Sequence, residues 1–237
     1  MTESYAERGD LMADTFRSVF DIIGPIMVGP SSSHTAGALT LGKAASQLFQ
    51  LQAKKVTIHY YESFAETHLG HGTDFAILGG ILGLSTEDPM LPHSLKMAES
   101  QHIDVQFIEE KGPSPVGHPN TATMILERED RRISATGCSI GGGSIQLNEV
   151  ELDQINMTID GYLPLYFIKQ NNLHNDLYTM DDWYAFFDHY NYKLSDIRIF
   201  QENEVEWVVL YMETAPSSQM MTDINDLVFV EEAILIS

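Results

Sequence analysis

Residues 29–50 read GPSSSHTAGALTLGKAASQLFQ, and this stretch decides how the first half of the chain is organised. A Gly-Pro pair marks a loop, and three serines and a His-Thr pair follow it. From Ala36 onward, good helix formers carry apolar side chains at helical spacing. Serine oxygens accept hydrogen bonds from the free N–H groups of a first helical turn. The stretch therefore predicts a loop that opens into a helix over 36–50.

Outward from this helix, the apolar pattern predicts a first group of strands and one more helix. The strands are expected at 54–61, 104–109, 121–126, 131–136 and 144–147. The helix is expected at 73–84, and its glycines predict close packing against another element.

The pattern of apolar and polar residues changes from about residue 155. The pattern predicts the order β-α-β-β-α-β, with elements at 165–169, 180–190, 196–200, 206–213, 217–227 and 228–236. This order is typical of a ferredoxin-like unit. An aromatic stripe at Trp183, Phe186, Phe187 and Tyr190 fits a core better than a ligand box. We expect an α+β fold with an α/β domain over 1–150 and an independent ferredoxin-like module over 151–237.

The charge balance is strongly acidic. The chain of 237 residues has 34 Asp and Glu against 13 Lys and Arg, which gives a formal net charge of −21. Such a surface repels phosphate backbones and anionic lipids, so nucleic-acid and membrane partners are not expected. The simplest interpretation is that the acidic surface keeps the protein soluble. The alternative is a long-range electrostatic field that disfavours anionic substrates. We find no apolar run of 18 residues and no signal peptide, which predicts a cytoplasmic protein.

A single cysteine, Cys138, limits the metal and redox chemistry of the chain. It excludes an intrachain disulfide, which fits a reducing cytoplasm. One cysteine cannot hold a zinc or iron–sulfur site by itself. We expect Cys138 to be a small buried residue.

Two motifs place histidine beside a helix start. In the first, Ser31 to Thr35 collect hydroxyls, backbone N–H groups and His34 at the positive end of a helix, which suits a carboxylate or a phosphate. In the second, residues 70–74 read GHGTD, and the flanking glycines leave His71 open to a ligand as a general acid or base. The alternatives are a well-capped helix and a loop histidine without a function.

Two further motifs come from the middle of the chain. Residues 117–121 read GHPNT, where Pro119 holds the turn after His118 and Asn120 offers a donor and an acceptor. This turn suits the wall of a small polar site, or else it is a surface turn. Residues 139–143 read SIGGG, which forms either an anion-binding nest or a flexible connection.

In this order, the four motifs resemble the beta chain, or beta domain, of bacterial iron–sulfur L-serine dehydratases. The resemblance covers residues 17–150, and its most specific part is the Ser-Ser-Ser-His-Thr motif within its Gly-Pro setting. It implies that L-serine loses water to give aminoacrylate, which hydrolyses to pyruvate and ammonia. It also implies a 4Fe-4S cluster whose open iron accepts the serine hydroxyl as a Lewis acid. Because the cluster cysteines are missing here, a cysteine-rich alpha subunit should hold it, and this chain should be inactive alone.

The resemblance also implies roles for individual residues. His71 and His118 become the catalytic candidates, with His71 preferred as the base for the Cα proton, and no metal ligand is expected in this chain. The residues expected to bind L-serine are Ser31, Ser32, Ser33, His34, Thr35, Asp74, Asn120 and Gly142. The base can instead come from the partner chain, in which case both catalytic candidates only position the substrate or neutralise charge.

The end of the chain resembles an ACT regulatory domain in the order of its elements only. ACT domains usually have a Gly- or Pro-containing ligand loop after their first strand, but residues 170–176 here contain neither. Amino-acid sensing and homodimerisation through this module both stay open.

Two other functions compete with the enzyme subunit. One is a free-standing module that binds a small carboxylate or an amino acid, because a similar domain in some phosphoglycerate dehydrogenases binds without catalysing. The other is a metal-dependent hydrolase in which His34, His71 and His118 meet in space.

Overall fold

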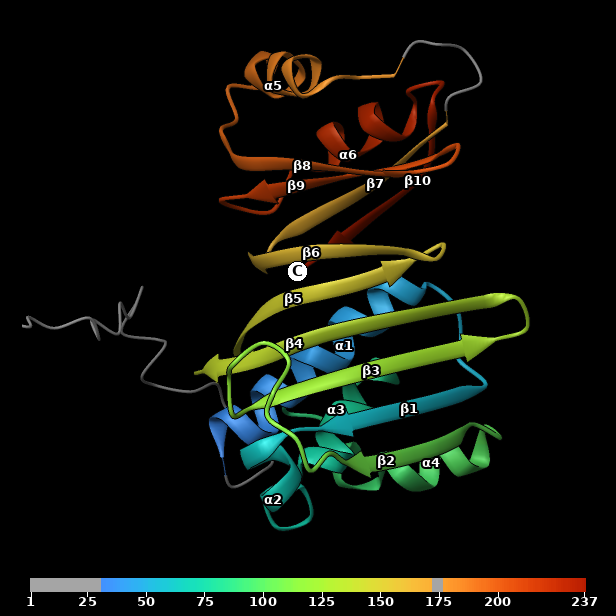
Figure 1. Ribbon diagram of the computed structural model, residues 1–237, viewed down its shortest axis with the longest axis vertical. Coiled ribbons are helices and arrows are strands. Elements are labelled where there is room, and N and C mark those ends of the chain that lie inside the picture. The colour runs from blue at the N-terminus through green and yellow to red at the C-terminus, as the bar shows by residue number, and fades with distance from the viewer. Residues whose placement is uncertain (1–30, 172–176) are drawn as a thin grey trace, which may run out of the picture.

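The computed structural model describes residues 31–171 and 177–237 as an α+β fold with two sheets, as expected. Figure 1 shows the first sheet with the helices α1, α3 and α4 behind it, and the second sheet above it with α5 and α6 on its outer face. No helix in these ranges is long and apolar enough to span a membrane.

The first sheet has six strands in the order β2-β1-β3-β4-β5-β6. Only β1 and β2 are parallel among these neighbours, and the other pairs are antiparallel. The strand bounds are Lys55–Tyr60 for β1, Asp104–Glu109 for β2, Thr121–Arg128 for β3, Arg131–Gly141 for β4, Ser144–Leu152 for β5 and Ile155–Tyr162 for β6.

Helices cover one face of this sheet. A π-helical turn, η2 (Ser32–Gly37), runs directly into α1 (Ala38–Phe49), so helical structure begins four residues before the expected start. The other helices are α2 (Glu62–His71), α3 (Thr73–Ile81), the short 3₁₀ helix η3 (Leu91–His93) and α4 (Ser94–Ser100).

The close packing expected for the glycine-rich helix is confirmed, because α3 lies against α1. A Cβ at Gly42 would lie 1.9 Å from the Ile77 carbonyl oxygen, and one at Gly80 would lie 2.0 Å from that of Leu39. Glycine at both positions therefore lets the two backbones touch.

The second sheet follows the expected order of elements. Its strands are arranged β10-β7-β9-β8 and are antiparallel throughout. The bounds are Leu165–Asn171 for β7, Met180–His189 for α5, Leu194–Glu202 for β8, Val205–Met212 for β9, Ser218–Asn225 for α6 and Val230–Ile236 for β10. Trp183 and Phe187 of α5 are fully buried beneath the helix, as expected for core residues.

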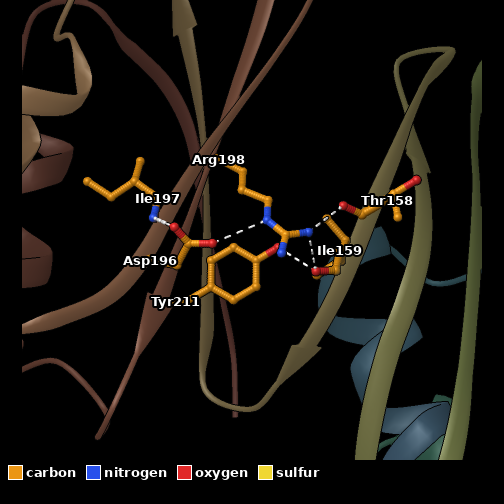
Figure 2. Close-up of polar contacts among 6 residues, drawn as sticks. All are labelled: Thr158, Ile159, Asp196, Ile197, Arg198 and Tyr211. Carbon is orange, nitrogen blue, oxygen red and sulfur yellow. Dashed lines mark hydrogen bonds and ion pairs between the residues drawn. The ribbon is translucent and has the colours of Figure 1, made fainter.

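The two sheets share one apolar core. The inner face of the second sheet, including Phe167, Trp207 and Ile234, belongs to the same cluster of buried side chains as α1 and the first sheet. Figure 2 shows a polar contact across the same junction, where Arg198 and Tyr211 reach the backbone of β6.

The boundary expected near residue 150 falls inside β5. Because β5 continues to Leu152 and pairs with β6, the first sheet ends at Tyr162, and the chain enters the second sheet through Leu163 and Pro164. The shared core also argues against an independent second module.

Candidate functional site

The fold brings the first and fourth motifs into contact. Gly37 at the end of η2 lies against Ser139, since a Cβ at Gly37 would be 1.9 Å from the Ser139 Oγ. Thr40 in the first turn of α1 donates a hydrogen bond of 3.0 Å to the Gly143 carbonyl. The start of the helix therefore rests on the turn between β4 and β5.

His34 is the centre of the hydroxyl cluster. Its Nδ1 lies 3.3 Å from the Ser31 Oγ and 3.1 Å from the Ser33 Oγ, and its Nε2 lies 3.3 Å from the Ser63 Oγ on α2. Ser31 is the N-cap, since its Oγ accepts the His34 N–H. The hydrogen bonds suit a neutral imidazole that accepts at Nδ1 and donates at Nε2. The Ser32 side chain and the loop at Gly29 and Pro30 lie outside the described structure.

The second motif lies directly beside the first. The His34 and His71 rings meet edge to face, with centroids 4.8 Å apart. Thr35 Oγ1 donates a hydrogen bond of 3.2 Å to the His71 carbonyl. The His71 Nδ1 is buried without a hydrogen-bond partner in the described structure. This nitrogen therefore has an unused hydrogen-bonding capacity beside the cluster.

The electrostatics keep His34 neutral. Burial lowers the pKa of His34, and the neighbouring His71 lowers it further, while a hydrogen bond to Ser63 opposes both. A neutral His34 donates through one nitrogen and accepts through the other, so it can meet either a hydroxyl or a carboxylate.

The third motif joins the same end of the sheet through its backbone. The Pro119 carbonyl accepts a hydrogen bond of 3.3 Å from the Phe64 N–H in α2, and the Asn120 carbonyl accepts one of 3.0 Å from the Ser139 N–H. His118 Nδ1 accepts the Asn120 N–H at 3.1 Å. Burial lowers the pKa of His118, against a smaller rise from Glu62.

His118 does not close a three-histidine site with His34 and His71. No hydrogen bond or ring contact joins it to either of them within the described ranges. Those ranges also contain no group of three or more His, Cys, Asp or Glu side chains placed to hold a metal ion. The geometry therefore gives the hydrolase alternative no support.

Asp74 is turned toward a residue that the sequence analysis missed. Its Oδ1 lies 2.7 Å from Nδ1 of the buried His68, whose Nε2 lies 2.9 Å from the Glu109 Oε1. At least one oxygen of the carboxylate expected to bind L-serine is thus engaged within the chain.

The glycine run is a tight hairpin connection and not a loose linker. Gly141, Gly142 and Gly143 all have positive φ, at 104°, 61° and 89°. Glycine reaches such values at little cost, whereas other residues do so rarely. The run sets the turn on which η2 rests, and Gly142 lies at its centre.

Cys138 is buried, as expected. Burial raises the pKa of its thiol to about 11, so the thiol stays protonated and is a poor metal ligand. With one cysteine in the whole sequence, this chain does not fit a 4Fe-4S cluster as a resident group.

A family sequence model described as "Serine dehydratase beta chain" matches residues 18–150, which is more than half of the chain. The chain belongs to the serine dehydratase beta chain family. The resemblance inferred from the four motifs is confirmed, and all four motifs lie within the matched residues. The match to the serine dehydratase beta chain family ends before β6, so β6 and the whole second sheet lie beyond it.

Relatives in this family include two beta chains. A "Probable L-serine dehydratase, beta chain" of Bacillus subtilis (strain 168) is 43% identical over 158 residues, which cover 66% of this chain and 70% of the relative. The "L-serine dehydratase, beta chain" of Peptoniphilus asaccharolyticus is 36% identical over 131 residues, which cover 55% and 59%. The longer "L-serine dehydratase TdcG" of Escherichia coli (strain K12) is 37% identical over 153 residues, but these are only 33% of its length.

Proposed function

We propose that this chain is the beta subunit of a two-chain L-serine dehydratase that converts L-serine to pyruvate and ammonia in the cytoplasm. The beta-chain relatives support a subunit role, and the longer L-serine dehydratase, of which the match covers only 33%, supports a second chain that supplies the remaining functions. A cysteine-rich alpha subunit would hold a 4Fe-4S cluster, which would supply the Lewis acid for the serine hydroxyl.

The observation that carries this proposal is the hydroxyl cluster around His34. Three hydroxyls, from Ser31, Ser33 and Ser63, surround one neutral imidazole whose edge faces His71. A substrate carboxylate needs several such donors, and it can displace their mutual hydrogen bonds. We assign the L-serine carboxylate to this cluster. Ser32 and Thr35 of the first motif, Asn120 of the third and Gly142 of the fourth are proposed to bind L-serine with it.

His71 is the proposed base for the Cα proton. Its ring touches the hydroxyl cluster, and its Nδ1 has no hydrogen-bond partner in the described structure. His118 is the rival, because its motif is tied to the same end of the sheet. Its Nδ1 accepts the Asn120 N–H, so the neutral ring carries its proton on Nε2 and would have to release Nδ1 and change tautomer before Nε2 could take the Cα proton. If the base comes from the alpha subunit, both histidines position the substrate.

The second sheet is proposed to form an ACT-like ferredoxin-fold module that supports homodimerisation. Its order β10-β7-β9-β8 leaves β8 and β10 as edge strands, and edge strands are natural sites of pairing between copies. Most of the loop considered for amino-acid sensing, residues 172–176, lies outside the described structure.

The test is co-expression with a cysteine-rich alpha chain under anaerobic conditions, followed by an assay for pyruvate from L-serine. We expect activity in the complex and none in the isolated chain. Robust deamination by the isolated chain would contradict the two-chain proposal. Binding of L-serine by the isolated chain, with no activity in any complex, would instead favour a free-standing binding module.

A further inference from the structure

His68 joins three elements at the corner beside His71. It lies in the last turn of α2 and is only 6% exposed. Its Nδ1 meets Asp74 in the first turn of α3 at 2.7 Å, and its Nε2 meets Glu109 at the end of β2 at 2.9 Å. Both ring nitrogens therefore face carboxylate oxygens.

This geometry defines the protonation state of the ring. An ionised carboxylate only accepts hydrogen bonds, so both nitrogens of His68 must donate, and only the imidazolium carries two N–H groups. A neutral ring would turn a nitrogen lone pair toward one of the two carboxylates. Burial opposes the charge, but the hydrogen bonds to Glu109 and Asp74 outweigh it and raise the pKa of His68.

Among the described residues, the only charged partners of the ring are Asp74 and Glu109. The Tyr60 ring of β1 lies 4.9 Å from the His68 ring, tilted by 30°. Burial, followed by the nearby Asp74, raises the pKa of Tyr60 well above its usual value, so Tyr60 stays neutral. The charged groups that face His68 are thus Asp74 of α3 and the 62% exposed Glu109 of β2.

The His68–Asp74 contact spans the turn that carries His71. His71 is the last residue of α2, and Gly72 follows it with a φ of 74° before α3 begins. A second tie holds the same corner, because Thr35 donates a hydrogen bond to the His71 carbonyl. Both ties hold the backbone around His71.

We propose that His68, held as an imidazolium between Asp74 and Glu109, is a positioning residue that fixes the α2–α3 corner and thereby holds His71 against His34. Its relevance to turnover rests on the proposed function, in which His71 acts beside the substrate. When His68 loses its proton, one of the two carboxylate contacts becomes repulsive, and the corner loosens.

Glu109→Gln is the sharpest probe, because Glu109 is exposed and its replacement by an amide keeps the shape. Glu110→Gln is the matched control, since Glu110 is the adjacent carboxylate and contacts a different histidine, His59, at 2.7 Å. In the full chain, ¹⁵N NMR should show both nitrogens of His68 protonated at pH 7. In Glu109→Gln the midpoint of His68 should fall by about 1 pH unit or more, whereas Glu110→Gln should leave it unchanged.

The same spectra test positioning without any need for activity. The nuclear Overhauser contact between the His34 and His71 rings should weaken as His68 deprotonates in the wild type. It should change less in Glu109→Gln, because the amide can donate a hydrogen bond to the neutral ring nitrogen. A neutral His68 at pH 7 in the wild type would overturn the proposal. So would a contact between the wild-type His34 and His71 rings that stays the same as His68 loses its proton.

In the assembled enzyme, Glu109→Gln should flatten the alkaline fall of kcat, because the amide can donate to the neutral His68 nitrogen, with KM within about twofold of the wild type, while Glu110→Gln keeps the wild-type profile. An unchanged profile in Glu109→Gln would overturn the role of His68 in turnover and leave the proposed function standing. A complex without serine dehydratase activity would overturn the proposed function, and the NMR result would then decide whether His68 positions His71.

Discussion

Arg198 lies over the ring of Tyr211, with its guanidinium carbon 4.9 Å from the ring centroid. Both side chains reach from the second sheet to β6, the edge strand of the first (Figure 2). Arg198 donates to the Thr158 and Ile159 carbonyls at 3.1 Å and 2.8 Å, and the Tyr211 hydroxyl donates to the Ile159 carbonyl at 2.6 Å. The polar contact and the shared apolar core together hold the two sheets as one unit.

Replacing Tyr211 by phenylalanine should destabilise the whole chain. Burial raises the pKa of Tyr211 to about 12, so the hydroxyl is a hydrogen-bond donor at neutral pH. Its loss should lower the free energy of unfolding by about 0.5–1.5 kcal/mol, the net worth of one hydrogen bond, since the Ile159 carbonyl keeps Arg198 as a donor. Urea denaturation measures the change. Tyr184→Phe, at an exposed position of α5, is the control, and equal stability of the two variants would contradict the contact.

Truncation after residue 150 should abolish cooperative folding of the first sheet. The cut removes β6 and the side chains from the second sheet that close the shared core. A fragment that ends at Tyr162 keeps all six strands but still exposes this core, so it should also melt well below the full chain. Circular dichroism melts of both fragments are the measurement. A native-like melt of the shorter one would restore the expectation of independent domains.

Histidine replacements in the assembled enzyme separate the two candidate bases. His71→Asn should slow the chemical step by about 10²–10⁴-fold if His71 removes the Cα proton. His118→Asn should then have a smaller effect, because its Nδ1 serves the backbone of its own turn. Single-turnover rates, compared at equal cluster content, decide between them. A His71→Asn enzyme within threefold of the wild type would eliminate this assignment.

Ser63→Ala should weaken the use of L-serine although no sequence motif includes Ser63. The change removes the hydroxyl beside the His34 Nε2, which should lower kcat/KM by roughly five- to tenfold for one lost hydrogen bond. The matched control is Ser100→Ala on the exposed end of α4, where the hydroxyl bonds only within its own helix. Steady-state kinetics of the two complexes should differ, and identical values would move the carboxylate site away from His34.

Stability should fall in mild acid because of His34 and His118. The pKa of each is lower in the folded chain than the usual value near 6.5, so the unfolded chain binds more protons in this range. The free energy of unfolding should decrease as the pH falls through about 6.5 and level off below the folded pKa values. Urea titrations at a series of pH values should show a shallower fall in His34→Gln than in the exposed control His93→Gln. His68 contributes with the opposite sign. Its pKa is raised in the folded chain, so its contribution to the free energy of unfolding is lost as the pH rises.

Several parts of this protein depend on local chemistry and were predictable from the sequence. The capping serines, the helix over 36–50 and the order of elements in the second sheet follow from hydroxyls, apolar spacing and turn residues that act over a few positions. Strand β6 also had a local signal, because Ile155, Met157 and Ile159 alternate with polar residues and point into the core, and the analysis missed it.

Other parts were decided by the tertiary structure alone. Only Phe64 and His68 of helix α2 are buried, and just one of them is apolar, so the sequence gives little apolar periodicity for this helix. Packing against the 118–121 turn and η2 holds it in place. The hydroxyl of Ser63 reaches His34 only because that helix forms. The pairing of His68 with Asp74 and Glu109 requires a corner at Gly72. It also requires the end of β2, 35 positions after Asp74, to lie beside that corner. Sequence by itself determined the residue types of the site and its local turns; the distances between them were set by long-range packing, because side chains far apart in the chain meet only when the sheet and helices assemble.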